Sequence, residues 1–287
     1  MKVIFLSSKD YPDCNCNYGD CILIDTGSEL IVYDCGSEEH AKRVQSYMHD
    51  HGYINLIFVL SHNDSDHFNG LDYLIDNNLV SVVYTHLLFK YVEDIMKILD
   101  DRRRNKYSVI NSIKNAFDNI ASLSERVELK DIFTDTVVTK GIIIAGPDKD
   151  YALEAVAKEI DNCSGDTIDD ETIRNAISTQ LSITFTQNKK LLLTGDSSFE
   201  SIKDNIINHT AIQLPHHGKQ DQAKQIFENK DNSTIYFVSD NTGNTNGGSD
   251  NLQTRGHVVF NTKNGDQICD IDKVSINEPK KSYFRII

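Results

Sequence analysis

The sequence predicts an α/β fold in which two strand-rich halves, each with helices on its outside, form a sandwich. Short apolar runs rich in β-branched residues recur along the chain, and stretches with helical spacing of apolar residues separate many of them. This order repeats more loosely in the second half. The 287 residues suit one layered unit, so we expect a single domain over residues 1–287.

The first half of the sequence begins with expected strands, and its first expected helix follows them. Its expected strands are the apolar runs at 2–6, 21–26, 29–34, 54–60 and 80–84. Its expected helices, with apolar residues three and four positions apart, lie at 38–51 and 68–76. Residues 87–123 predict two more helices, which we interpret as an insertion.

The second half continues the same order. Its expected strands lie near 126–129 and 133–145 and at 180–186, 190–194, 211–214 and 234–239. Its expected helices lie near 151–160, 198–207 and 220–228. Residues 240–251 are rich in Asn, Gly, Asp and Ser, which predicts a long loop ahead of His257.

Charge and hydropathy narrow the classes of function. The chain has 29 Lys and Arg against 43 Asp and Glu, a net charge of −14, which disfavours a nonspecific DNA-binding protein. No segment approaches the ~20 apolar residues of a membrane span, and the first apolar run is too short for a signal peptide. We therefore expect a cytoplasmic protein without membrane association, whose six cysteines are reduced.

One dense group of polar residues follows the expected strand at 54–60. His62, Asp64, Asp66 and His67 fall within six residues, where a loop can turn imidazole and carboxylate groups toward one point. This density predicts a metal site. The alternative is a polar loop in which Asp66 caps the following helix.

Two later strand ends carry further ligand-type residues. Asp196 follows the strand at 190–194, and the pair His216 and His217 follows the strand at 211–214. Taken singly, Asp196 could cap a helix and the histidines could lie in a surface turn. Three such clusters at strand ends can instead converge on one metal centre.

The sequence resembles the metallo-β-lactamase superfamily, and within it the soluble hydrolase domain of the competence protein ComEC. The marks that carry the resemblance keep a specific order: Gly19-Asp20, Asp34-Cys35-Gly36, His62-x-Asp64-x-Asp66-His67-x-x-Gly70, Thr194-Gly195-Asp196, Pro215-His216-His217-Gly218 and Gly256-His257. The resemblance implies a four-layer αββα sandwich of the metallo-β-lactamase type, with the helical insertion around 87–123.

The resemblance also implies two divalent metal ions. It assigns His62 and Asp64 to the first ion, Asp66 and His67 to the second, and Asp196 to both. His216 would complete the second site because it directly follows the strand, with His217 as the alternative ligand or as a partner of the ligands.

The chain departs from the commonest superfamily motif at two points. Asp64 stands where that motif has a second histidine, as in ComEC-like members. No clear histidine supplies the usual third ligand of the first site, and Asn175 or Ser178 is the nearest polar candidate. A carboxylate in place of an imidazole makes manganese credible beside zinc.

The expected chemistry is hydrolysis. Two adjacent metal ions can generate a hydroxide at neutral pH and stabilise both the entering and the leaving oxygen of an in-line attack. With Asp66 and Asp196 at the ions, a phosphodiesterase or nuclease is the preferred hypothesis. His257 would touch the phosphoryl oxygen or the leaving group. The alternative for His257 is a surface position at a strand edge.

Several other hypotheses stay open. The chain could hydrolyse a small ester, thioester or lactam, because a fold does not decide a substrate. It could be a redox enzyme, although the flavin domain of such relatives is absent, or a noncatalytic subunit. Bacterial proteins with this motif set act beside partners in DNA processing or phage defence, so a protein partner could supply basic surface. The basic run 102–106 could hold a nucleic-acid backbone or be a solvated helix end.

Overall fold

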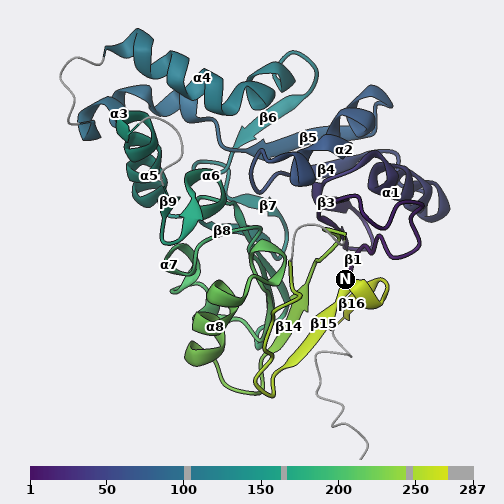
Figure 1. Ribbon diagram of the computed structural model, residues 1–287. Coiled ribbons are helices and arrows are strands. Elements are labelled where there is room, and N and C mark those ends of the chain that lie inside the picture. The colour runs from purple at the N-terminus through teal and green to yellow at the C-terminus, as the bar shows by residue number, and fades with distance from the viewer. Residues whose placement is uncertain (100–104, 163–166, 244–247, 271–287) are drawn as a thin grey trace, which may run out of the picture.

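A computed structural model gives the arrangement of the chain and describes residues 1–99, 105–162, 167–243 and 248–270. Two seven-stranded sheets form its centre (Figure 1). The first has the order β16-β1-β2-β3-β4-β5-β6, with bounds β1 (Lys2–Phe5), β2 (Cys21–Asp25), β3 (Leu30–Cys35), β4 (Leu56–Val59), β5 (Val80–Thr85), β6 (Glu128–Asp131) and β16 (Gln267–Asp270).

The second sheet has the order β15-β14-β13-β12-β11-β8-β7. Its strands are β7 (Val137–Thr139), β8 (Ile142–Gly146), β11 (Gln180–Thr186), β12 (Lys189–Leu193), β13 (Ala211–Gln213), β14 (Ile235–Val238) and β15 (Val258–Asn261). A separate two-stranded hairpin consists of β9 (Thr167–Ile168) and β10 (Glu171–Thr172). The strands expected near 133–145 are β7 and β8, and Gly141, at a φ of +82°, allows the turn between them.

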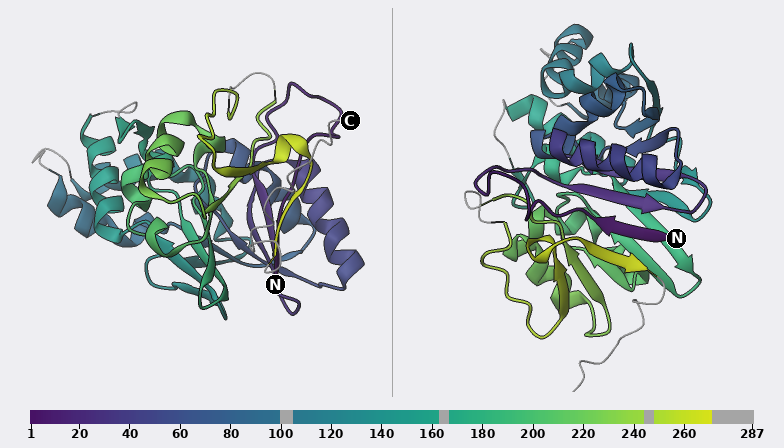
Figure 2. Two further views of the ribbon diagram at one scale, coloured as in Figure 1. Left: turned by 90° about the horizontal axis from the view of Figure 1, so that it is seen from below. Right: turned by 90° about the vertical axis from the view of Figure 1, so that its right-hand side faces the viewer.

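The helices lie outside the two sheets. They are α1 (Glu38–His51), α2 (Ser65–Asp76), α3 (Val92–Ile98), α4 (Lys106–Leu123), α5 (Lys149–Asn162), α6 (Ile173–Ala176), α7 (Phe199–Ile202) and α8 (Gln220–Asn229), with short 3-10 helices at Leu88–Tyr91, Ile206–Asn208, His216–Gly218 and Thr262–Asn264. Figures 1 and 2 show α1 and α2 on one side of the sandwich and α7 and α8 on the other.

Three apolar clusters hold the layers together. Between the two sheets, Tyr33 of β3 and Leu193 of β12 are buried, and Phe5 stacks on Phe237 with ring centroids 4.7 Å apart. The alternate residues of β3, such as Val32, pack against the helices instead. This alternation follows from the two-residue period of a strand and produces a core on each face of the sheet.

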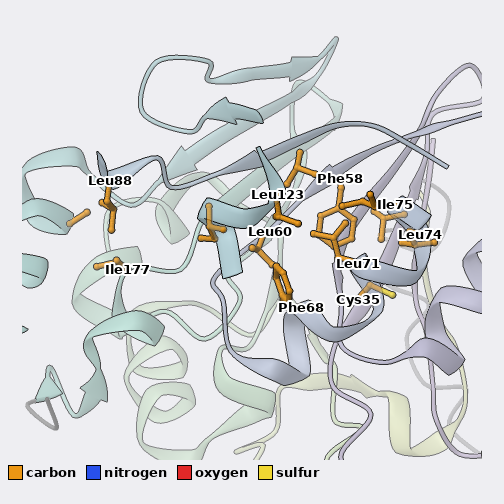
Figure 3. Packing of buried hydrophobic residues seen from close by; sticks show 14 of the residues in the cluster. Cys35, Phe58, Leu60, Phe68, Leu71, Leu74, Ile75, Leu88, Leu123 and Ile177 are labelled. Atoms are coloured by element: carbon orange, nitrogen blue, oxygen red, sulfur yellow. The ribbon is translucent and has the colours of Figure 1, made fainter. Parts of the chain in front are cut away.

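The outer clusters complete the sandwich. Phe58 of β4 packs with Leu71 and Leu74 of α2 under the first sheet, as Figure 3 shows. Ile212 of β13 packs with residues of α7 and α8 on the second sheet, among them Ile226. The predicted four-layer αββα sandwich is therefore confirmed.

The predicted helical insertion consists of the 3-10 helix at Leu88–Tyr91, α3 and α4, between β5 and β6. Helix α5 packs against α3 and α4. Residues 102–104 of the basic run lie outside the described residues, and Lys106 forms an exposed ion pair with Glu93. None of the helices in the described part of the chain combines the length and the apolar composition that crossing a lipid bilayer requires.

Parallel strands position the functional residues. Strands β3, β4 and β5 run parallel in the first sheet, and β12, β13 and β14 run parallel in the second. Polar residues follow the carboxyl ends of β4, β12 and β13, so both sheets contribute loops to one edge of the sandwich.

Candidate metal centre

The three predicted clusters meet at this edge. Two groups of ligand-type side chains each have their candidate atoms within 4.8 Å of one another: His62, His67 and Asp196, and Asp66, His67 and His217. His67 belongs to both groups and Asp196 is buried beside them. Residues from three separate loops therefore come together as the sequence predicts.

The alternative role of these aspartates as helix caps does not match the geometry. Asp64 is the N-cap of α2, but its side chain makes no capping hydrogen bond. Asp66 lies in the first turn of α2 and its carboxylate accepts a hydrogen bond from Asn17. Ser198, rather than Asp196, caps α7. The three carboxylates are thus free to serve the cluster.

Asp66, His67 and His217 form what we call the braced half of the centre. His67 Nε2 lies 3.5 Å from Asp196 Oδ1 and 4.0 Å from Asp66 Oδ1. His217 Nε2 lies 3.2 Å from Asp66 Oδ2 and 3.9 Å from Asp196 Oδ2. The ring nitrogens that face the centre are therefore the Nε2 atoms.

The other ring nitrogens of the braced half are tied to buried carboxylates. His67 Nδ1 donates to Asp34 Oδ2 over 2.8 Å, and His217 Nδ1 donates to Asp20 Oδ1 over 3.0 Å. Both carboxylates are fully buried. Such partners fix the orientation of a metal-ligating imidazole and leave Nε2 for the ion.

Close backbone approach makes this bracing possible. The amide of Asp20 donates to the carbonyl of Asp66 over 2.9 Å. A Cβ atom at Gly19, whose φ is +66°, would lie 1.8 Å from that carbonyl oxygen, and one at Gly36 would lie 2.1 Å from it. Glycine is needed at both positions so that the loops after β1 and β3 can reach the start of α2.

His62 and Asp64 form what we call the open half. His62 Nε2 lies 3.7 Å from Asp64 Oδ2, and Asp64 Oδ1 lies 3.6 Å from Arg174 Nη1. The Asp64 side chain is 36% exposed. Within the described part of the chain, the far nitrogen of His62 has hydroxyl partners, with Nδ1 2.9 Å from Ser61 Oγ and 3.2 Å from Ser178 Oγ.

Neither candidate for the third ligand of the open half is a strong donor. Ser178 Oγ accepts a hydrogen bond from the Asp196 amide, and the Asn175 side-chain oxygen accepts one from Thr172. Among the described residues, Asp64 belongs to neither metal-type group, and His67 is the one other imidazole in the group that contains His62. The two halves therefore differ in how firmly their side chains are held.

The electrostatics of the cluster favour a cation. Burial opposes ionisation of Asp196, but the facing His67 and His217 rings outweigh it and hold the pKa of Asp196 well below its usual range. Burial likewise opposes protonation of His67 and His217, yet Asp196 and the bracing carboxylates raise the pKa of both well above the usual value. Ionised carboxylates around these rings create a negative potential that draws positive charge.

The donor set fits a divalent metal ion. The Nε2 atoms of His62 and His67 and Oδ1 of Asp196 are buried and make no hydrogen bond with any described residue. Unpaired buried polar atoms are costly, and ligation of a metal ion would satisfy all three. Imidazole nitrogens suit zinc, and carboxylate oxygens also admit manganese.

The adjacent histidines have different positions. His217 is buried and its Nε2 belongs to a metal-type group, whereas the His216 side chain is 32% exposed and its Nε2 lies 4.0 Å from Asp196 Oδ2. His216 Nδ1 donates to Glu171 Oε2 over 2.7 Å. The backbone at both histidines is left-handed, with φ of 52° and 53°, which turns His217 inward. The sequence favours His216, and the geometry places His217 among the ligand atoms.

His257 does not join the cluster, which corrects the expectation that it contacts the phosphoryl group. Its ring stacks on Phe227 at 4.6 Å and meets Tyr236 edge-on at 5.3 Å. It directly precedes β15, which runs parallel to β14 with Val258 opposite Ile235. His257 therefore lies at the amino ends of these strands, whereas the metal-type residues follow carboxyl ends.

The centre opens into a cleft of about 730 Å³. Apart from Gly248, every described residue that lines it is polar: Asn17, Asp64, Asp66, Asn175, Asp196, His216, His217, Lys219, Gln220, Asp221, Thr242 and Asn251. A small apolar substrate finds no hydrophobic wall here.

Sequence reasoning missed the side chains behind the ligands. Asp20 and Asp34 stand within motifs that carry the resemblance, but no role was assigned to either. The available signal was their position at strand ends, since Asp20 directly precedes β2 and Asp34 is the penultimate residue of β3. Asn17 and Arg174 carry no local signal, because their contacts with Asp66 and Asp64 span 49 and 110 residues of chain.

Comparisons with known proteins agree with the fold. A family model described as "Metallo-beta-lactamase superfamily" matches residues 14–239. The metallo-beta-lactamase fold protein YhfI from Bacillus subtilis is 15% identical, with 93% of this chain and 99% of that chain covered and a TM-score of 0.53. Zn(2+)-bound PqqB from Methylobacterium extorquens is 14% identical, with coverage of 94% and 100% and a TM-score of 0.49. A diphosphatase from the PhnP family is 11% identical, with coverage of 94% and 98% and a TM-score of 0.49. No curated protein matches the sequence.

Proposed function

The chain belongs to the metallo-beta-lactamase superfamily, and from this premise we propose that it is a metal-dependent phosphodiesterase or nuclease. The hydrolase fold and the cluster of histidines and aspartates support a metal-dependent hydrolase. The phosphodiester as substrate is the finer part of the proposal. The resemblance of the motif set to that of ComEC-type hydrolases supports it, and bacterial DNA processing or phage defence is the setting that this resemblance implies.

We assign the candidate ligands to two divalent ions, zinc or manganese. Asp66, His67 and His217 would hold one ion, and His62 with Asp64 would hold the other. Asp196 stands beside both groups and would contact both ions. His217 is preferred to His216 because its Nε2 lies within reach of Asp66 and Asp196.

When bound, divalent ions activate water at neutral pH and stabilise negative charge on a phosphoryl group. The chain's own residues prepare this site. Asp34 and Asp20 hold the Nδ1 protons of His67 and His217, so that both Nε2 atoms present a lone pair to the centre. Asn17 Nδ2 donates a hydrogen bond to Asp66 Oδ2 and so helps to orient this carboxylate. Asp66 and Asp196 are the carboxylates closest to the reacting group in this proposal.

The polar lining of the cleft is the observation that favours a phosphodiester substrate. Pockets for small acyl substrates are lined mainly by hydrophobic and aromatic side chains. This cleft has none among the described residues that line it. An open, polar cleft fits a hydrated, charged substrate whose charge is neutralised by metal ions. For a long nucleic acid, the net charge of −14 favours a partner that supplies basic surface.

The test compares three substrates at fixed metal content. Metal-loaded protein is expected to cleave bis(p-nitrophenyl) phosphate and a single-stranded oligonucleotide, and to leave an acyl thioester intact. Asp196→Ala should abolish both reactions and lower the bound metal measured by elemental analysis. Asp204→Ala, at an exposed position outside the cleft, is the matched control. Thioester turnover without phosphodiester cleavage, or cleavage that persists after metal removal, contradicts the proposal.

A further inference from the structure

A single lysine interrupts the acidic lining of the cleft. The carboxylates of Asp64, Asp66 and Asp196 line this cleft. Lys219 is the one Lys or Arg among the described residues that line it. It is the residue at the start of α8, and its side chain is 33% exposed. A lysine in an acidic cleft that binds cations needs a reason of its own, because it opposes metal binding by like-charge repulsion.

A buried glutamate holds this lysine in place. Lys219 Nζ lies 2.9 Å from Glu171 Oε1 and 3.1 Å from the Asp170 carbonyl oxygen. Glu171 is only 1% exposed, and its second oxygen accepts the hydrogen bond from His216. An ammonium group has three N–H donors, of which two are used by the described residues. The third donor is left for a group in the cleft.

The segment that carries Glu171 is itself firmly anchored. Asp169 and Asp170 form the turn between β9 and β10 at φ of 54° and 65°, a left-handed conformation that Gly, Asn and Asp adopt in such hairpin turns. Asp169 accepts hydrogen bonds from Tyr151 of α5 and, through its carbonyl, from Gln222 of α8. These contacts anchor the turn beside Glu171, which faces Lys219 and His216.

We propose that Lys219, positioned by Glu171, is the binding residue for a second phosphate of the substrate, next to the group that is cleaved. The proposal rests on the proposed function. The His216 ring and the Glu171 carboxylate lie between Asp196 and Lys219. His216 Nε2 is 4.0 Å from Asp196 Oδ2, His216 Nδ1 is 2.7 Å from Glu171 Oε2, and Glu171 Oε1 is 2.9 Å from Lys219 Nζ. Lys219 is thus displaced from the metal-type groups and suits a neighbouring phosphate rather than the scissile one.

Two substrates separate this role from a general contribution to activity. A dinucleotide with a terminal phosphate carries a second anionic group, whereas bis(p-nitrophenyl) phosphate has only the scissile one. Lys219→Met is expected to lower kcat/KM for the phosphorylated dinucleotide roughly ten-fold or more, mainly through KM, because a charge-assisted hydrogen bond is lost. For bis(p-nitrophenyl) phosphate, kcat/KM should change less than two-fold in the same variant, by that reasoning.

Further variants test the roles of charge and anchor. Lys219→Arg keeps the positive charge and should retain most of the preference for the phosphorylated dinucleotide. Glu171→Gln removes the charged anchor and should weaken that preference in the same direction, with metal content unchanged. Lys203→Met, at an exposed surface ion pair with Glu200, is the control and should change neither substrate. Equal loss with both substrates, or none with either, overturns the proposal.

A binding measurement keeps the two proposals distinguishable. If neither substrate is cleaved, the proposed function fails, and the affinity of metal-loaded protein for inorganic pyrophosphate decides the role of Lys219. Weaker binding by Lys219→Met than by wild type, with Lys203→Met unchanged, supports a phosphate-binding lysine. Equal affinity of Lys219→Met and wild type contradicts it.

Discussion

The two halves of the centre contain the same kinds of side chain but differ in what stands behind them. In the braced half, each residue has an outer partner: Asp34 for His67, Asp20 for His217 and Asn17 for Asp66. In the open half, hydroxyl groups flank His62, and Asp64 is partly exposed beside Arg174.

We expect this difference to affect metal affinity, because the partners behind the ligands tune affinity along with ligand type. A carboxylate behind an imidazole fixes its orientation and raises its basicity, and loss of such a partner typically costs 10–100-fold in metal affinity. The guanidinium of Arg174 beside Asp64 should instead weaken metal affinity, because its positive charge repels a metal ion bound there. We expect the braced half to hold the tighter ion.

The largest expected effect separates the two aspartates of the motif. Asp66→Ala removes a ligand from the braced half and should lose the tight ion and nearly all hydrolysis. Asp64→Ala should keep one ion per chain and measurable activity. Elemental analysis after exhaustive dialysis gives the metal content of each variant. Equal metal loss in both would remove the distinction between the halves.

The adjacent histidines provide the next test of the braced half. His217→Ala should lower metal affinity on the order of 100-fold or more. Loss of a residue that only orients a ligand typically costs 10–100-fold in metal affinity, and loss of the ligand itself should cost at least as much. His216→Ala should leave the metal content unchanged because the His216 side chain is 32% exposed and belongs to neither metal-type group. Titration with zinc in competition with a chelator measures both. The reverse order would make His216 the ligand.

Removal of one brace should have an intermediate effect. Asp34→Asn keeps the size of the side chain and tolerates the left-handed φ of 60° at this position. It removes the charge behind His67, so metal affinity should fall about 10–100-fold. Competition titration measures the affinity, and the thermal unfolding midpoint without metal checks that the fold persists. Unchanged affinity in a folded variant would show that the brace is dispensable.

The braced half should also make stability depend on pH. The pKa values of His67 and His217 are raised in the metal-free fold, so protonation of the two rings stabilises the folded state. This stabilisation is complete below the unfolded-state pKa of about 6.5 and is lost as the pH rises through the folded-state pKa values. Metal ligation requires both Nε2 atoms to be unprotonated, so metal affinity should rise over the same range. Thermal unfolding of metal-free and metal-loaded protein at pH 6 to 9 should show opposite trends.

The smallest expected effect concerns the open half. Arg174→Met removes the positive charge 3.6 Å from Asp64 and should tighten the weaker ion a few-fold, the size expected for a partly exposed charge pair. Calorimetric titration resolves the second binding event. The tight ion should be unaffected. A weaker second ion in this variant would mean that Arg174 supports the open half instead of opposing it.

Much of the centre could be predicted because its chemistry is local in sequence. His62, Asp64, Asp66 and His67 share one loop after β4, and Asp196 directly follows β12. Strand ends bring such residues to the edge of a sheet whatever the details of packing. The layered fold followed from the two-residue and 3.6-residue periods of apolar residues for a similar reason.

Other features depended on contacts between distant segments. The choice between His216 and His217 turned on a left-handed backbone and on Asp20, 197 residues away. His257 carried a plausible motif, but the parallel pairing of β15 with β14 placed it at the wrong end of the strands. Glu171 and Lys219 are separated by 48 residues and have no pattern in common.

The sequence by itself therefore determined the layers, the hydrolase family and the residue types of the centre, because these follow from short-range periodicity and spacing. Only the tertiary structure decided which histidine lies among the clustered ligand-type atoms, which half is braced and where a lysine enters the acidic cleft. Those outcomes depend on strand register and on buried carboxylates brought from far along the chain, which local patterns do not encode.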